Sequence, residues 1–319
     1  VGVAGLLALF APQEAAAIPA FARQTEKSCS TCHVAFPKLN QTGQNFRTNG
    51  FRFPEDKEWK DVQDLKHVPL SAEIEIEGEF EKEAGGNQST LLHVDEISLL
   101  AGSPLGKDGR ASAYGVVNFA NAEFGVGQAY IQVNDLIGET GHGLLNVKGG
   151  QFEIALPFLS STQRVIKERY LAQEALGILG ASKIDPLKEH ETEEIYNAGV
   201  EINGQIVGKE ATDLTHRYAA GVSQPKSINN VNTLGRPGFY ATYAINFLEN
   251  FNLGLIYKRD VVNSMAGPFI DGRKGVNKYG IAGDAKVGPF IATLGYFRSD
   301  GLPADFLLGF QPGEDTNRS

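Results

Sequence analysis

The fold class is indicated most clearly by the stretch Ser71-Ala72-Glu73-Ile74-Glu75-Ile76-Glu77-Gly78-Glu79-Phe80-Glu81-Lys82. Glutamate occupies every odd position from Glu73 to Glu81, and small or apolar residues occupy the even positions from Ala72 to Phe80. Successive side chains of a strand point to opposite faces, so this period of two predicts a β-strand with one acidic and one apolar face. The acidic face is either exposed to bulk solvent or lines a water-filled barrel whose apolar face meets lipid.

The same alternation recurs along the chain, in about eleven segments of roughly ten residues that turn residues separate. The segments include 71–82, 111–119, 129–133, 196–202, 239–247, 251–257, 279–287, 290–297 and 306–310. Strands of a soluble sandwich are usually about five or six residues long, so the longer segments favour a membrane barrel over a sandwich. We therefore expect an all-β fold, with an antiparallel transmembrane β-barrel over residues 71–319 that is incomplete in this chain.

The barrel interpretation assigns a side to each alternating residue. The expected lipid-facing positions are Ile74, Ile76, Ala241, Tyr243, Ile245 and Leu253, and the expected lumen positions are Glu73, Glu75 and Glu77. Residues 161–179 break the alternation and are expected to form a helical or extended loop over the barrel mouth, followed by a charged loop at 183–194. The tail at 313–319 is loop-like, whereas outer-membrane barrels normally close on a strand that ends in an aromatic residue, so we expect a C-terminally truncated barrel.

The N-terminal residues and the overall charge indicate where the protein is found. Residues 1–17 combine an apolar run with Ala15-Ala16-Ala17, which predicts a secretory signal peptide whose start is truncated, since a basic n-region is missing. The run is too short to span a bilayer as a helix. The formal net charge of −9 argues against a nucleic-acid partner, which would call for a basic surface. The signal predicts export, and export together with the barrel pattern predicts a protein of the bacterial outer membrane, with membrane lipid as one of its partners.

The sequence Cys29-Ser30-Thr31-Cys32-His33 has the C-x-x-C-H pattern of covalent c-type haem attachment. Two thiols at this spacing can add to the two vinyl groups of one porphyrin, and the adjacent imidazole can then ligate the iron. A zinc half-site or a redox dithiol is the alternative. A structural zinc site would require a second pair of Cys or His ligands, and the chain has no other cysteine. A redox dithiol would be expected in a βαβ unit, which the following sequence does not predict.

Residues 18–70 are expected to form a monohaem cytochrome c domain with one covalent haem c, held by Cys29, Cys32 and His33 as the proximal iron ligand. The residues from Phe36 to Arg47 predict a short helix, and Gly50 is its expected stop. His67 is the first candidate for the distal iron ligand because it ends this segment. His93, Met265 and an iron that is open or water-ligated remain alternatives, and the choice changes the haem potential strongly.

One part of the sequence resembles the haem domain of the fused monohaem cytochrome–porins, a family that includes iron-oxidising outer-membrane cytochromes. The resemblance covers about forty residues and rests on Ile18-Pro19-Ala20-Phe21-Ala22-Arg23, Ser28-Cys29-Ser30-Thr31-Cys32-His33, Phe36-Pro37-Lys38-Leu39-Asn40, Gly43, Phe46 and Asn49-Gly50. The segment Leu156-Pro157-Phe158-Leu159-Ser160 also looks like a loop of that family. The resemblance implies a haem domain that plugs a barrel of about sixteen strands, more than the segments counted here.

The resemblance also implies a function, namely electron transfer between an extracellular donor, Fe(II) in characterised members, and periplasmic electron carriers. Membership does not by itself establish iron oxidation, because the family includes cytochromes of unknown donor. Two other functions remain open. One is a soluble periplasmic monohaem electron-transfer protein with a β-rich partner-binding domain, and the other is a porin whose haem only regulates it. The sequence contains no acid–base or nucleophile arrangement that would compete with these three functions.

Overall fold

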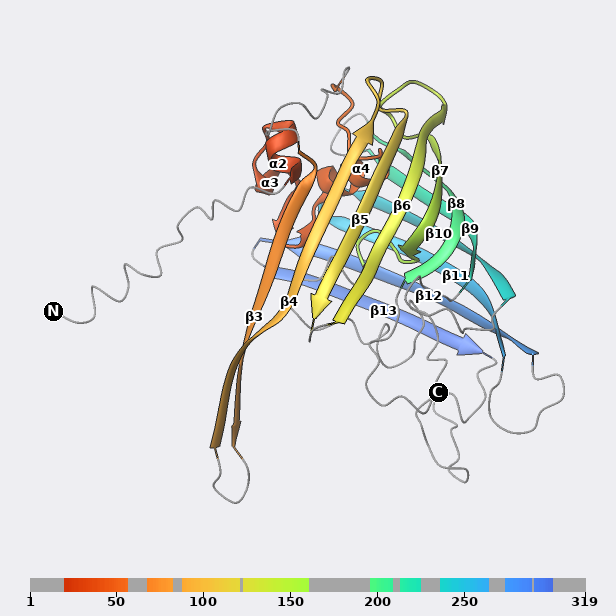
Figure 1. Ribbon diagram of the computed structural model, residues 1–319. Helices are drawn as coiled ribbons and strands as arrows, with labels where there is room; N and C mark the ends of the chain where they lie inside the picture. Colours follow the sequence, from red (N-terminus) through yellow and green to blue (C-terminus); the bar gives the residue numbers. More distant parts are fainter. Residues whose placement is uncertain are drawn as a thin grey trace.

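An antiparallel β-sheet of eleven strands makes up most of the structure, which is a computed structural model (Figure 1). It describes residues 20–56, 68–82, 88–120, 123–160, 196–208, 213–224, 236–263, 273–288 and 290–300. The strands are β3 (Leu70–Lys82), β4 (Gln88–Leu105), β5 (Ala111–Ala120), β6 (Glu123–Ile137), β7 (Leu145–Glu153), β8 (Tyr196–Ile206), β9 (Thr215–Gln224), β10 (Arg236–Phe247), β11 (Phe251–Asn263), β12 (Arg273–Val287) and β13 (Phe290–Asp300). Each strand pairs with its neighbours in the sequence, so the spatial order is the chain order from β3 to β13.

The antiparallel all-β prediction is confirmed. The alternating segments at 71–82, 111–119, 129–133, 196–202, 239–247, 251–257, 279–287 and 290–297 all fall within strands. The strands β4, β7 and β9 contain none of the predicted alternating segments. The expected strand at 306–310, the loops at 161–179 and 183–194, the signal peptide at 1–17 and the tail at 313–319 lie outside the described residues.

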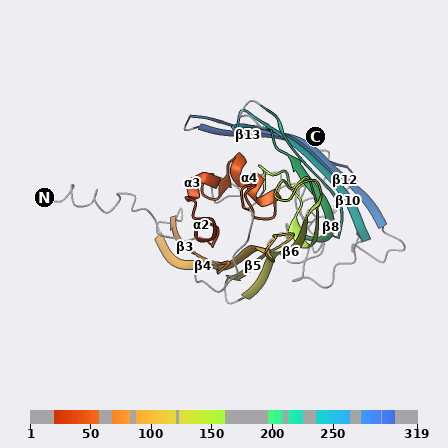
Figure 2. The ribbon, with the colours of Figure 1, turned by 90° about the horizontal axis from the view of Figure 1, so that it is seen from above.

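The sheet is not closed into a barrel. β3 pairs only with β4, and β13 pairs only with β12, so within the described residues the sheet has two open edges. Seen along the strands, the sheet curves round the N-terminal helices as an open wall (Figure 2). The closed form of the predicted barrel is therefore absent from the described chain, although the curvature and the strand order of a barrel are present.

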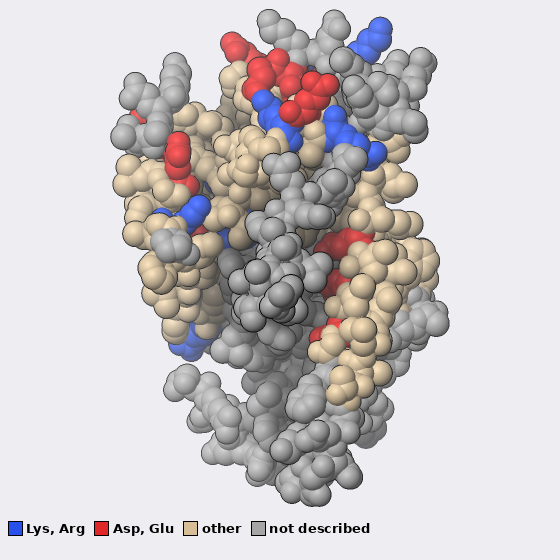
Figure 3. All heavy atoms as spheres, turned by 90° about the vertical axis from the view of Figure 1, so that its left-hand side faces the viewer, with Lys and Arg blue, Asp and Glu red and all other residues tan. Residues whose placement is uncertain are grey.

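The convex face of the sheet carries apolar side chains that are exposed. Ile74 is 61% exposed and Ile76 is 67% exposed, while Glu73, Glu75 and Glu77 between them are half-buried. Ala241, Tyr243 and Leu253 are likewise exposed, and Ile245 is partly exposed. All six positions expected to face lipid thus lie on the convex face of the sheet. Figure 3 shows charged side chains gathered at the end that carries the N-terminal helices, above flanks that are largely uncharged.

The concave face carries buried polar side chains instead. The buried polar residues include Gln128, Gln132, Asn134, Asp135, Asn146, Gln151, Asn197, Glu201, Asn203, Arg217, Asn246, Asn252, Lys258, Lys278 and Asp284. They are covered because the N-terminal segment 20–56 and the segment 154–160 after β7 fold into the curve of the sheet. A buried apolar cluster that includes Phe46, Phe152, Leu156 and Phe158 packs among them. The difference from a soluble sandwich is on the outer face, which is apolar here and polar there.

The N-terminal segment consists of short elements: α2 (Ala20–Thr25), α3 (Cys29–Cys32), a two-stranded ribbon of β1 (His33–Ala35) and β2 (Lys38–Leu39), and α4 (Gln41–Thr48). The predicted helix is thus confirmed only in its second half, because Asn40 caps α4 and the residues before it form the ribbon. Gly50, the expected stop, follows α4 with a positive φ of 65°. No helix in the described part of the chain is long and apolar enough to cross a membrane.

Candidate functional site

The two cysteines lie at the two ends of α3, a single helical turn. Residues three apart in a helix share a face, so the turn brings both thiols to the same side. Both thiols are free; Cys29 is exposed and Cys32 is half-buried. Burial raises the pKa of the Cys32 thiol, and the nearby Lys27 ammonium opposes that shift. The cysteines are therefore placed as a pair at an accessible surface.

His33 follows the helix directly, and its ring is oriented by the backbone. The Nδ1 atom lies 3.1 Å from the carbonyl oxygen of Pro37. Such a bond fixes the ring and the tautomer, which leaves Nε2 as the atom able to ligate a metal. Burial lowers the pKa of His33, against hydrogen bonds to the backbone of Pro37 and Lys38, and so favours the neutral imidazole that a metal requires.

The ring of Phe36 lies beside this histidine, with its centroid 5.4 Å from that of His33. Phe36 is 67% exposed, so its ring offers an apolar surface beside the half-buried imidazole. Two free thiols on one side of a helical turn, an imidazole with Nε2 available and an adjacent exposed aromatic ring are the donor set and the apolar surface that a covalently attached haem requires. The residues present therefore fit that group.

Asn40 and Gly43 dock α3 onto α4. The Asn40 side chain accepts a hydrogen bond from the backbone N–H of Gly43 and donates one to the carbonyl oxygen of Thr31, at 2.9 and 3.0 Å. A Cβ atom at Gly43 would come within 2.3 Å of the Cys32 carbonyl oxygen, so only glycine permits this approach. The residues around the motif that the family resemblance rests on thus have a packing role that the structure explains.

A buried ion pair fastens the N-terminal segment to β6. Nη2 of Arg52 lies 2.5 Å from Oδ2 of Asp135, and both side chains are almost completely buried. Asp135 also accepts hydrogen bonds from the backbone N–H groups of Gly141 and Gly143, at 3.0 and 2.8 Å. Because the carboxylate is fully hydrogen-bonded, the pair holds a fixed geometry between the segment and the turn after β6.

A second buried ion pair reaches β12, near the other edge of the sheet. Nζ of Lys38 lies 2.9 Å from Oδ2 of Asp284 and also donates to the carbonyl oxygen of Phe158, at 3.2 Å. Phe158 belongs to the segment 154–160, whose side chains Leu156 and Phe158 are buried against β11 around Gly254. The segment that the family resemblance indicated as a loop therefore lies inside the curve of the sheet and contacts the N-terminal segment.

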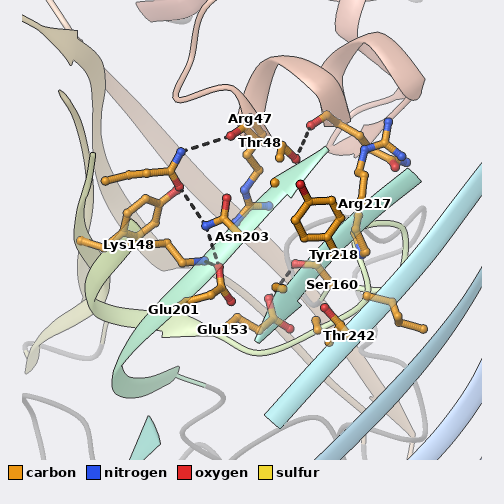
Figure 4. A pocket seen from close by; sticks show the side chains of 18 of the residues that line it. Arg47, Thr48, Lys148, Glu153, Ser160, Glu201, Asn203, Arg217, Tyr218 and Thr242 are labelled. Carbon is orange, nitrogen blue, oxygen red and sulfur yellow. Dashed lines mark hydrogen bonds and ion pairs between the residues drawn. The ribbon is translucent and has the colours of Figure 1, made fainter. Parts of the chain in front are cut away.

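A polar cavity of about 120 Å³ lies between α4 and the concave face of the sheet (Figure 4). Arg47 and Thr48 line it from α4, and Lys148, Glu153, Glu201, Asn203, Arg217, Tyr218 and Thr242 line it from the sheet. Nζ of Lys148 lies 2.6 Å from Oε1 of Glu201, so one cation and one anion of the wall are already paired. The cavity is a small space beside the N-terminal segment 20–56, with polar walls of both charges.

Of the three residues predicted as distal iron ligands, His93 alone lies among the described residues. His67 and Met265 lie outside the described residues. His93 lies on β4 and is paired in register with Glu77. Ala20 contacts Ser71 near the start of β3, whereas Glu77 lies about 20 Å further along that strand at roughly 3.3 Å a residue, towards the end remote from α2 and α3 (Figure 1). His93 is not brought next to the cysteine motif.

The sequence predicted Cys29, Cys32 and His33 as haem-binding residues, but it did not predict the residues that fix their segment to the sheet. Arg52, Asp135 and Asp284 belong to no motif, and Lys38 lies in a resemblance segment that says nothing of its partner. The partners in both ion pairs are far apart along the chain. The one available signal was that Asp135 and Asp284 occupy polar positions of alternating strands. No protein-family model matches the chain, and no curated protein is significantly similar to it.

Proposed function

We propose that this chain is an outer-membrane monohaem cytochrome–porin that conducts electrons from an extracellular donor, with Fe(II) as the first candidate, to periplasmic carriers. The observation that carries the proposal is a curved sheet with apolar residues outside and polar residues inside, whose concavity holds the CxxCH segment. The alternation of exposed apolar and buried polar residues is that of strands between lipid and a polar lumen. The placement of the motif inside the curve suits a plug.

The membrane part of the proposal rests on the convex face. Exposed apolar side chains follow one another across neighbouring strands, for example Leu255 on β11 opposite Ile281 on β12. A continuous apolar surface of this extent is costly in water and favourable in hydrocarbon. The open edges at β3 and β13 carry unpaired backbone groups, which in lipid must find partners. We therefore propose that further strands complete the barrel between these edges.

The electron-transfer part of the proposal rests on α3 and β1. Cys29 and Cys32 would hold the porphyrin through two thioether bonds, and Nε2 of His33 would ligate the iron. When bound, the haem supplies a one-electron Fe(III)/Fe(II) couple. The Pro37 carbonyl would keep the His33 ring in place, and the buried pairs Arg52–Asp135 and Lys38–Asp284 would keep the segment at a fixed depth in the sheet. These contacts make the segment a plug and restrict open diffusion.

Attachment is tested first, on the full chain expressed with a haem-maturation system and extracted with detergent. A denaturing gel should show a haem peroxidase stain, and Cys29→Ala/Cys32→Ala should abolish it. Ser30→Ala is the matched control, because Ser30 lies between the cysteines, and its stain should equal that of the wild type. An unstained wild-type band would overturn the haem assignment. Extraction without detergent would favour the soluble periplasmic alternative.

Conduction is tested in liposomes loaded with a coloured electron acceptor. Externally added Fe(II) should reduce the interior only when haem-loaded protein is present, and the Cys29→Ala/Cys32→Ala protein should give the leak rate of empty liposomes. Equal reduction by the haemless protein would overturn the proposal that the haem conducts electrons, and would favour the alternative of a porin whose haem is regulatory. Success with another donor but not with Fe(II) would keep the conduit and remove iron as its donor.

A further inference from the structure

The hairpin of β3 and β4 brings three side chains of metal-binding type together on the concave face of the sheet. The ligand atoms of Glu77, His93 and Asp95 all lie within 4.8 Å of one another, and the three residues are half-buried. Glu77 and His93 are directly paired across the two strands. The group lies at the edge of the sheet, remote from the cysteine motif, and the proposed function gives it no role.

A β-bulge produces this grouping. Glu75 pairs with Glu96 and Ile76 pairs with Val94, so β4 has Asp95 as an extra residue at this point. Val94 is exposed on the convex side, whereas Asp95 and Glu96 both lie half-buried on the other side. A regular strand would place one inward residue between successive outward ones. Bulges commonly serve to redirect a side chain, and this one adds a carboxylate beside His93.

The chemistry of the three groups suits a divalent first-row transition metal ion. One imidazole nitrogen and two carboxylate oxygens form a mixed donor set that Zn²⁺, Fe²⁺ and similar ions accept, whereas the imidazole disfavours Ca²⁺ and Mg²⁺. Bonds of about 2.0–2.2 Å place the ligand atoms of one shell roughly 3–4 Å apart, so small side-chain rotations from the observed arrangement suffice. The two carboxylates would neutralise the charge of the ion.

The alternative is an ordinary ion pair. Nε2 of His93 lies 4.0 Å from Oδ1 of Asp95, a contact that attracts only when the imidazole is protonated. However, Nδ1 of His93 is buried and has no hydrogen-bond partner among the described residues. An imidazole nitrogen shielded from water without a partner is costly, and an ion-pair interpretation leaves that cost in place. A metal bound at Nδ1 would use the atom that the ion pair leaves without a partner.

We propose that Glu77, His93 and Asp95 bind one divalent transition metal ion on the concave face of the β3–β4 hairpin. The glutamates before it on β3, Glu73 and Glu75, lie on the same face and would raise the local concentration of cations. Three protein ligands leave further coordination positions to water. The site needs neither the haem nor the cysteines, and in this it goes beyond the proposed function.

The test uses the full-length protein in detergent after removal of metals with a chelator. Zn²⁺ titrated by calorimetry, and Co²⁺ followed by its visible absorption, should each show one saturable site. His93→Ala and Glu77→Gln should each weaken binding by at least about tenfold, since each removes a direct ligand. Glu75→Gln is the matched control, on the same strand and the same face but outside the group, and should bind within about twofold of the wild type.

Cu²⁺ provides a readout that a folding defect would not imitate. The electron paramagnetic resonance spectrum of the wild type should show coupling to one imidazole nitrogen, and His93→Ala should lose this coupling while its circular dichroism stays that of the wild type. Absence of a saturable site in the wild type, or equal weakening by His93→Ala and Glu75→Gln, would overturn the proposal. Repeating the titration with Cys29→Ala/Cys32→Ala separates this outcome from failure of the haem assignment.

Discussion

The convex and concave faces of the same strands differ in both the polarity and the burial of their side chains. On β11, Leu255 is 52% exposed on the convex face, whereas Lys258 on the concave face is 1% exposed. The convex face has no covering element among the described residues, while segments 20–56 and 154–160 cover much of the concave face. The exposed apolar face of this sheet is therefore not its core, which lies on the concave side, where a buried apolar cluster that includes Phe46, Tyr130 and Phe152 packs beside ion pairs and amide hydrogen bonds.

The largest loss of stability is expected when a buried charge is removed from the concave side. Asp135→Ala should destabilise the folded protein by about 3–5 kcal/mol, because it leaves the Arg52 guanidinium buried without its counter-ion. Unfolding by denaturant in detergent micelles measures the loss. Asp108→Ala is the control: its pair with Arg110 is exposed on both sides, and it should cost about 1 kcal/mol or less. Equal losses would mean that the segment is not held by the buried pair.

A charge on the convex side is expected to have the second largest effect. Leu255→Lys should cost about 2–4 kcal/mol if the position lies near the bilayer midplane, because an ammonium group is then transferred into hydrocarbon. Leu255→Met, which keeps the apolar character, should stay within about 1.5 kcal/mol of the wild type. Unfolding titrations in lipid vesicles give both values. If Leu255→Lys were neutral in vesicles, the convex face would not contact lipid.

A smaller loss of stability is expected from the contact between α3 and α4, which lies within the concave side. Asn40→Ala removes the N-cap of α4 and the hydrogen bond to Thr31, so it should cost about 1–2 kcal/mol. Asn40→Asp keeps the acceptor for the Gly43 N–H but loses the donor to Thr31, and should cost less. Amide hydrogen exchange of residues 28–48 reports this region separately from the sheet. If exchange rose equally in both variants, the cap would not be the stabilising contact.

The smallest effect is expected where the concave side is not covered by a packed segment. Glu75→Gln should change the free energy of unfolding by no more than about 0.5 kcal/mol, as is usual for polar substitutions away from a network. The same denaturant titration measures it. A loss as large as that of Asp135→Ala would show that the acids of β3 belong to the packed interior, and the two ends of the concave face would then no longer differ.

The strand pattern was predictable because it is local. The alternation of Ile74 and Ile76 with glutamates gives both the strand and the side of each residue. The helix α4 was misplaced at its start because Asn40 acts as a cap, which only the Gly43 N–H in its actual position reveals. The pair of Arg52 and Asp135 was not predictable, because the residues lie 83 positions apart and neither belongs to a motif. An incomplete barrel was expected, but its open edges at β3 and β13 could not be placed from the sequence, since closure depends on how much each strand pair twists and tilts.

Several residues of the N-terminal segment contact partners far along the chain, and this separation affects the order of folding. Each strand pairs with the next one in sequence, so the sheet can grow hairpin by hairpin as the chain becomes available. Gln41, in contrast, bonds to Thr215, 174 residues later, and the partner of Lys38 is on β12. The segment made first therefore reaches its native contacts among the last. Under the proposed function, the CxxCH turn would be less enclosed before these last contacts form, and a maturation enzyme would then reach both thiols.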